Sequence, residues 1–265
     1  MRAMIVLHPA LPFAPWADPR TRRLPGVMPL DIDDWLRVDE VYAEQMALRD
    51  ALIAERPAEV HGVLPQAEAA AAELLALVRP RLTGLGFAAV AGGWRRPDGV
   101  VVAEGLPLLT LGRLLQEDFC LMQPDGAGEH ALTGAILCFP AGWTLAEKLG
   151  RPLMRVHRPV AAYDDDMGRR VQRLMDAIRP ESPMWRMNAN ASRAPLFNPQ
   201  PEDQVRGATR ADFPYVRCER QCLIRLPISR AVVFSIHSYV VRREDLTPEQ
   251  TVALMEHPLN HTIQA

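Results

Sequence analysis

Apolar residues recur with helical spacing in three segments of this chain. Two of them, residues 39–55 and 66–79, lie in the first third, and Pro80 should end the second because proline cannot continue a helix. The third segment follows the acidic run that starts at Asp164, and its apolar positions repeat every three or four residues up to Ile178. These spacings predict three amphipathic helices.

Strand signals dominate the chain after residue 98. Short runs rich in apolar residues occur at residues 99–104, 118–122, 132–140, 222–226 and 231–241. Only a Pro-Ile-Ser-Arg linker separates the last two runs, so they are predicted to form an antiparallel pair. A final helix should start after Thr247, and residues 1–80 read as an extended arm plus helices. Helices around antiparallel strands predict the α+β class.

Two short segments lie between these elements. Thr144 and Glu147 have the spacing of a capping box, and Gly150 could take the left-handed position that follows a helix, which predicts a short helix at 145–149. The apolar run that leads into His157 reads as a strand that a following proline ends.

Composition narrows the classes of function. Of the 265 residues, 48% are hydrophobic, which is enough for a sizeable core, and a net charge of −2 without a basic block disfavours nucleic acid as a partner. No run approaches the roughly 20 apolar residues of a membrane span. His8 and two prolines break the apolar run at the N-terminus, so we predict a cytoplasmic protein without a signal peptide. The chain carries no flavin, nicotinamide or iron–sulfur motif.

Five segments carry a family resemblance. They are QEDFCLM (116–122), CFPAGWTLAEKLG (138–150), WRMN (185–188), LFNP (196–199) and RCERQCLIRLPISRAVVFSIHSY (217–239). Together they resemble the haem-dependent oxidative N-demethylase alpha-subunit-like family, formerly a domain of unknown function. The resemblance implies one domain over residues 1–265, with a PAS-like antiparallel sheet core at 98–245 and helical additions at both ends.

The same resemblance implies an activity and a cofactor. The chain would bind haem b and use dioxygen to remove a methyl group from a small methylated amine such as dimethylamine, releasing formaldehyde. The implied partner is a separate reductase chain with flavin and iron–sulfur centres, and self-association stays open. The alternative is a non-catalytic PAS-like sensor that binds haem or another small ligand, because a fold does not fix a function. A third reading is a fold that has lost haem.

His157 is the predicted ligand of the haem iron. A neutral imidazole at a strand end could donate an electron pair to iron. The alternative is an ordinary hydrogen-bonded histidine at a sheet edge. Arg155 and Arg158 flank His157 and could meet haem propionates, or they could be surface charges.

Lys148, Arg186 and Asn188 are predicted to bind haem propionates or substrate. The resemblance favours Lys148. Arg186 and Asn188 alternate with apolar neighbours and should share one strand face, where a guanidinium and an amide can together hold a carboxylate. They could equally cap a neighbouring helix.

Glu117 is the predicted catalytic carboxylate. Glu117 and Asp118 are adjacent in a strand-like run, so they should point to opposite faces, and which of them faces a pocket stays open. A pocket carboxylate would suit an N-demethylase, because it could hold the substrate ammonium or accept its proton. His237 is a weaker candidate for a second axial ligand.

Overall fold

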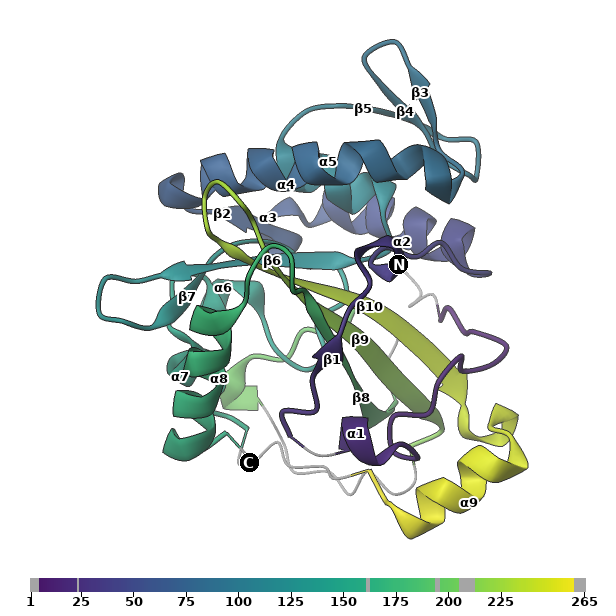
Figure 1. The fold of residues 1–265 in the computed structure, drawn as a ribbon. Coiled ribbons are helices and arrows are strands. Elements are labelled where there is room, and N and C mark those ends of the chain that lie inside the picture. The colour runs from purple at the N-terminus through teal and green to yellow at the C-terminus, as the bar shows by residue number, and fades with distance from the viewer. Residues whose placement is uncertain (1–4, 23, 161–162, 194–195, 205–212, 260–265) are drawn as a thin grey trace.

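A seven-stranded sheet lies at the centre of the protein (Figure 1). The computed structural model describes residues 5–22, 24–160, 163–193, 196–204 and 213–259. Every neighbouring pair of strands in this sheet is antiparallel. The strands follow one another in the order β1 (Met28–Pro29), β8 (Met184–Ser192), β9 (Tyr215–Arg225), β10 (Val232–Arg242), β6 (Asp118–Pro124), β7 (His130–Ile136) and β2 (His61–Val63). A smaller antiparallel sheet contains β3 (Ala88–Val90), β4 (Gly93–Arg95) and β5 (Val101–Ala103).

The helices form two groups beside the large sheet, and two more lie near the termini (Figure 1). The first group consists of α2 (Tyr42–Glu55), α3 (Pro57–Val60), α4 (Glu68–Leu82) and α5 (Pro107–Leu114). The second group consists of α6 (Leu145–Lys148), α7 (Leu153–Val156) and α8 (Asp165–Ala177). The remaining two are α1 (Pro19–Arg22) and α9 (Pro248–Glu256). Helices together with an antiparallel sheet confirm the α+β prediction.

The two faces of the large sheet meet different parts of the chain. Side chains alternate along each strand, so strand register decides which residues share a face. Cys120, Phe234 and Leu223 are aligned across β6, β10 and β9, and they pack with residues of α6, α7 and α8. We call this side the α8 face. The opposite side, which includes Phe119 and Cys222, packs against α2, α4 and α5 and is called the α2 face.

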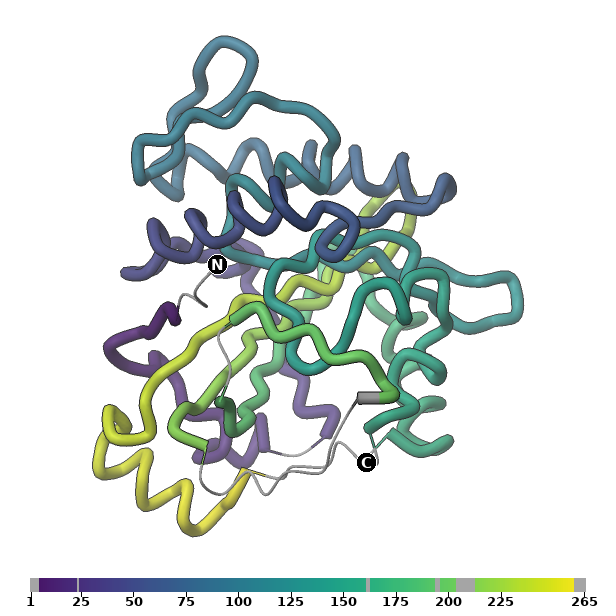
Figure 2. Tube along the Cα trace, turned by 180° about the vertical axis from the view of Figure 1, so that it is seen from behind, coloured from purple at the N-terminus to yellow at the C-terminus, as the bar shows by residue number. Residues whose placement is uncertain are grey.

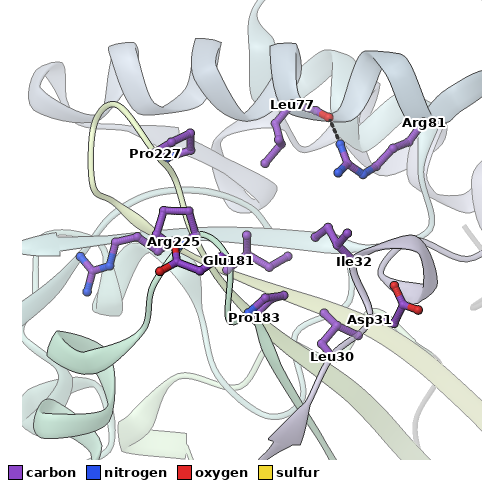
Figure 3. A pocket seen from close by; sticks show the side chains of 11 residues that line it. Leu30, Asp31, Ile32, Leu77, Arg81, Glu181, Pro183, Arg225 and Pro227 are labelled. Atoms are coloured by element: carbon purple, nitrogen blue, oxygen red, sulfur yellow. Dashed lines mark hydrogen bonds between the residues drawn. The ribbon is translucent and has the colours of Figure 1, made fainter.

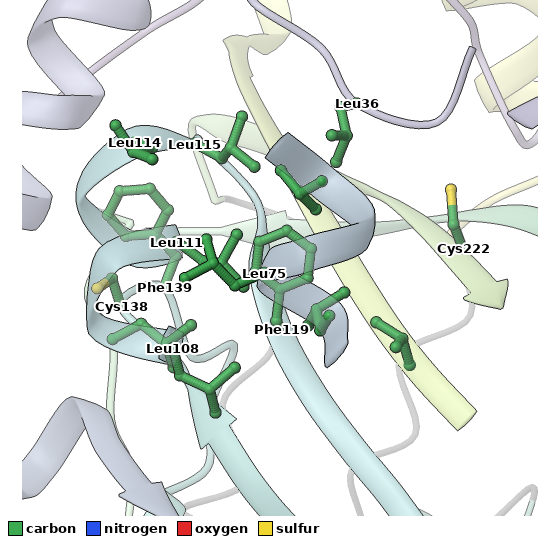
Figure 4. Packing of buried hydrophobic residues seen from close by; sticks show 14 of the residues in the cluster. Leu36, Leu75, Leu108, Leu111, Leu114, Leu115, Phe119, Cys138, Phe139 and Cys222 are labelled. Atoms are coloured by element: carbon green, nitrogen blue, oxygen red, sulfur yellow. The ribbon is translucent and has the colours of Figure 1, made fainter. Parts of the chain in front are cut away.

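The main core lies on the α2 face (Figure 4). Phe119 of β6 is fully buried there, together with Leu75 of α4 and Leu111 of α5. The N-terminal segment continues this packing, because the indole of Trp35 is buried and its Nε1 donates to Ser235 Oγ at 2.8 Å. Much of the predicted N-terminal arm is therefore packed onto the sheet.

The N-terminal segment runs beside α9, the last helix (Figures 1 and 2). Trp16 Nε1 donates to the carbonyl oxygen of Gln250 at 3.0 Å. The helix itself begins with a complete capping box, in which the Thr247 hydroxyl accepts from the Gln250 backbone and the Gln250 side chain accepts from the Thr247 backbone. This start is the one that the sequence predicts.

Three predicted elements differ in the structure. Pro80 does not end α4, which continues to Leu82, because the fully buried Leu82 holds the last turn against the core. β7 ends at Ile136 instead of continuing to residue 140, since the backbone N–H groups of Cys138 and Phe139 donate to the carboxylate of Asp118 and not to a strand.

The third difference concerns the segment that carries His157. It is a single helical turn, α7, and His157 is the residue that caps its C-terminal end. The strand prediction was wrong here because a four-residue apolar run does not distinguish a buried strand from one turn of helix.

Candidate functional site

Four of the five predicted site residues lie on the α8 face of the sheet or beside it. The charges of Lys148 and Arg186 both act on the imidazole of His157, which places these three residues near one another. Asn188 shares the strand face of Arg186 on β8. Glu117 lies apart, because its carboxylate bonds to His237 on the α2 face.

His157 is held in the neutral form by its surroundings. Its Nδ1 lies 3.0 Å from the carbonyl oxygen of Leu153, which can only accept, so Nδ1 carries the proton. Burial lowers the pKa of His157 to about 4, outweighing the bond to that carbonyl, which raises it, and the positive charges of Lys148 and Arg186 lower it further. At neutral pH the ring is therefore uncharged and Nε2 carries its lone pair. This tautomer, fixed by a backbone carbonyl, is the one that metal-binding histidines adopt.

Tyr163 fixes the plane of the His157 ring. The two rings are stacked, with centroids 4.1 Å apart and an angle of 13° between their planes. The Tyr163 hydroxyl is buried and has no hydrogen-bond partner among the described residues, and burial raises its pKa to about 12. It is a neutral donor available to a ligand. Sequence analysis did not select Tyr163, and its only signal was an aromatic residue close after His157.

Arg186 forms no ion pair with a carboxylate among the described residues, although the charge of Glu219 acts on it. Its Nη1 donates to Gln221 Oε1 at 3.0 Å, whereas its Nε is buried without a partner. Burial lowers the pKa of Arg186, although a guanidinium stays charged at neutral pH. An unpaired guanidinium beside an apolar sheet face is the donor that a carboxylate or propionate would satisfy.

Asn188 holds the buried carboxylate of Glu219, which is not one of the predicted site residues. Its Nδ2 donates to Glu219 Oε2 at 3.2 Å, and its Oδ1 accepts the backbone N–H of Glu219 at 3.1 Å. Glu219 also pairs with Arg217 at 3.2 Å and accepts from Gln221 at 3.0 Å. The register of β8 and β9 places Glu219 on the same strand face as Arg186.

Lys148 is buried, with 3% of its side chain exposed, and it forms an ion pair with Glu202. Sequence analysis did not select Glu202, which lies in a short 3-10 turn (Glu202–Gln204) and is 54 residues away from Lys148 in the chain. Its backbone N–H donates to Glu147 Oε1 at 3.1 Å, while the Thr144 hydroxyl donates to Glu147 Oε2 at 2.5 Å. The predicted capping box is therefore absent, because Glu147 binds the Thr144 side chain and the turn instead of the helix start.

Glu117 forms part of a separate buried network. The imidazole of His237 bonds through Nδ1 to Glu117 Oε1 at 3.0 Å and through Nε2 to Asp39 Oδ2 at 2.9 Å. Burial alone would lower the pKa of His237, but hydrogen bonds to Asp39 and Glu117 outweigh it and raise the pKa to about 9. Both ring nitrogens are protonated and occupied in this state, so His237 has no lone pair for iron.

His8 extends this network without making it a metal site. His8 Nε2, His237 Nε2 and an oxygen of Asp39 lie within 4.8 Å of one another. The backbone N–H of Val240 donates to His8 Nδ1 at 3.2 Å, so the proton of the neutral ring is on Nε2 and bonds to Asp39 at 2.9 Å. A metal on Nε2 would leave both ring nitrogens without protons. The geometry therefore favours a hydrogen-bonded chain over a set of metal ligands.

Asp118, the neighbour of Glu117, has a structural role. Asp118 Oδ1 accepts from Arg49 Nη1 and from the backbone N–H of Cys138, both at 2.7 Å. Its other oxygen accepts from the backbone N–H of Phe139 at 2.9 Å. These partners tie the carboxylate of Asp118 to Arg49 and to the segment that follows β7.

A cavity of about 430 Å³ lies elsewhere, between α4, β9 and the segment that precedes β8 (Figure 3). Leu77 and Arg81 of α4 line one side, and Leu30 and Ile32 of the N-terminal segment line another. None of the five predicted site residues belongs to its lining. The predicted site and this cavity are therefore distinct parts of the molecule.

The fold and the site together define an α+β protein with a neutral, fixed histidine and an unpaired guanidinium on one sheet face. The family model described as haem-dependent oxidative N-demethylase, alpha subunit-like, matches residues 26–84 and 95–260. The chain belongs to this family, as its motifs predict, and all five predicted site residues lie in the matched ranges. No helix in the described part of the chain is long and apolar enough to cross a membrane.

Proposed function

We propose that this protein is a haem b-dependent oxygenase that removes a methyl group from a small amine such as dimethylamine and releases formaldehyde. Membership of a haem-dependent demethylase family supports the class of reaction. The observation that carries the proposal for this chain is the tautomer of His157, whose Nδ1 proton is held by Leu153 and whose Nε2 keeps its lone pair.

The residues around His157 suit a dianionic porphyrin. His157 would ligate the iron, and Arg186 and Lys148 would receive the propionates, since the buried Nε of Arg186 lacks a partner. Asn188 would act by holding the Glu219 carboxylate in place. When bound, the haem would supply the activation of dioxygen and the oxidation of the carbon next to the amine nitrogen. Electrons would come from a reductase chain with flavin and iron–sulfur centres. The PAS-like description of residues 98–245, the single-domain organisation and a cytoplasmic location stay predictions.

The carboxylate that meets the substrate amine has two candidates. Glu117, the residue predicted from the sequence, lies on the α2 face and bonds to His237. Glu219 lies on the same strand face as Arg186, and its three side-chain donors leave one of about four acceptor positions on its carboxylate. We propose that Glu219 holds the substrate ammonium. Before oxidation, the ammonium would lose its proton to the Glu219 carboxylate or to water.

Replacing the two carboxylates one at a time tests this assignment. The Glu219→Gln protein, loaded with haem and supplied with electrons, is expected to lose about tenfold or more in kcat/KM for dimethylamine, because a charged hydrogen bond to the substrate is lost. Glu117→Gln is the matched variant and should keep KM while it reduces stability. The readout is formaldehyde released per haem. A larger rise in KM in Glu117→Gln than in Glu219→Gln would assign substrate binding to Glu117. A wild-type protein that binds haem but releases no formaldehyde would favour the sensor alternative.

A further inference from the structure

Three cationic side chains surround one carboxylate beside His157. Lys148 Nζ and Arg155 Nη1 both reach Glu202 Oε1, the latter at 2.9 Å, and Arg158 Nη2 lies 3.5 Å from Glu202 Oε2. Hydrogen bonds from Arg155 and Lys148 lower the pKa of Glu202 to about 2, so this carboxylate is charged at neutral pH. Glu202 is the carboxylate that all three cations contact, and the charge of Glu147, which accepts the Glu202 backbone N–H at 3.1 Å, also acts on Arg155.

The cations and the carboxylate are not held equally firmly. Lys148 belongs to α6 and Arg155 to α7, and both helices are anchored in the core by the buried residues Leu145 and Leu153. Glu202 belongs to a three-residue 3-10 turn in the connection between β8 and β9. Two of the cations, Lys148 and Arg155, therefore stand on elements held by core packing, Arg158 is mostly exposed, and the carboxylate is supplied by a connection.

The cluster lies next to His157. Arg155 and Arg158 flank His157 in the chain, and the charge of Lys148 acts on the His157 ring. Since Lys148 is almost fully buried, leaving it without a counter-charge would be costly, and some carboxylate must occupy the site in every state of the protein.

We infer that Lys148, Arg155 and Arg158 form a binding site for one haem propionate, and that Glu202 occupies this site until haem binds. Haem binding is then an exchange of one carboxylate for another at Lys148, while the unpaired Arg186 takes the second propionate without a competitor. Glu202 sets the affinity for haem by competing with it. The inference rests on the proposed function, because it requires His157 to bind haem.

A haemin titration of the Glu202→Gln protein tests this inference. The variant keeps the size of the side chain but frees the three cations, so haemin is expected to bind about tenfold more tightly than in the wild type at pH 7. Iron protoporphyrin dimethyl ester has no free carboxylate, so its affinity should be the same in both proteins. Glu202→Asp keeps the charge and should bind haemin as the wild type does.

Glu129→Gln serves as the matched control variant. Glu129 Oε1 accepts the backbone N–H of Met154 in α7 and is not paired with any of the three cations, so its replacement removes a nearby negative charge without touching the site. It should leave the haemin affinity within about twofold. Thermal melting of the apo proteins shows whether Glu202→Gln is folded, and its apo form is expected to be less stable than the wild type and to gain more from haemin.

The outcomes separate the inference from the proposed function. If the wild type binds haemin and Glu202→Gln binds it equally or more weakly, Glu202 is only an anchor of its turn and the inference fails alone. A gain for the dimethyl ester as large as that for haemin would also overturn it, since no propionate would be involved. If the wild type binds neither porphyrin, the proposed function fails and the inference fails with it.

Discussion

The contribution of His237 to the free energy of unfolding is expected to fall by about 2 kcal/mol as the pH rises from 6 to 8. The lowered pKa values of His157, His61 and His130 raise the stability over the same range, so the effect is measured as the difference between the wild type and a His237 variant. The His237 imidazole is buried between two carboxylates, Asp39 Oδ2 at 2.9 Å and Glu117 Oε1 at 3.0 Å, which raise its pKa to about 9. A histidine in the unfolded chain has a pKa of about 6.5. The folded protein therefore binds the proton more tightly, and this stabilisation is complete below pH 6.5 and is lost as the pH rises toward 9.

Replacing His237 should remove both the stabilisation and its pH dependence. The His237→Leu protein leaves the carboxylates of Asp39 and Glu117 buried without their cation, which is expected to cost about 3–5 kcal/mol at pH 6. The measurement is urea unfolding of the apo protein at several values between pH 6 and 8, a range that avoids the titration of the cysteine thiols. His61→Gln is the matched control: burial lowers the pKa of His61, so its removal should not reduce the stability lost between pH 6 and 8. A His237→Leu protein with the same pH dependence as the wild type over this range would show that His237 is neutral.

Replacing Asp118 by asparagine is expected to destabilise the protein by about 3–5 kcal/mol, which is the other large effect. Arg49 is completely buried and donates to three backbone carbonyls, of Gly112, Gln116 and Glu117, but its only carboxylate partner among the described residues is Asp118. An asparagine amide would leave this guanidinium without a counter-charge. The asparagine NH2 group would also point toward the backbone N–H groups after β7, which donate to the carboxylate in the wild type.

Urea unfolding of Asp118→Asn measures this effect, with Glu59→Gln as the control. Glu59 pairs with Arg56 at 3.4 Å, but about half of each side chain is exposed, so its loss should cost less than about 1 kcal/mol. Similar small effects for both variants would mean that the Arg49–Asp118 pair does not anchor the end of β7. A large difference between them would confirm that Asp118 is structural, whatever its neighbour Glu117 does.

The spacing of residues along the chain was enough to predict the features that lie within a single strand or helix. Arg186 and Asn188 share a strand face because their spacing is two, and the helix from Asp165 to Ala177 follows its apolar stripe and its N-cap at Asp164. The short run before His157 was misread, because four residues are too few to distinguish the period of a strand from that of a helix.

Pairings across the chain could not be predicted from the sequence. Glu202 meets Lys148 across 54 residues, and Asp39 meets His237 across 198 residues. Each contact depends on the order and register of strands that a single sequence does not specify. The same limit explains why the opposite directions of Glu117 and Asp118 were predicted but their partners, His237 and Arg49, were not.

The most direct test of the central claim is the absorption spectrum of the purified protein after reconstitution with haemin, in the wild type, His157→Ala and His61→Ala. His61 is a suitable control because it is half-buried and its Nε2 also lacks a partner among the described residues. We expect a Soret band in the wild type and in His61→Ala, and a shifted or lost band in His157→Ala that added imidazole restores. An unchanged band in His157→Ala, or no band in any of the three proteins, would contradict the assignment of His157 as the haem ligand.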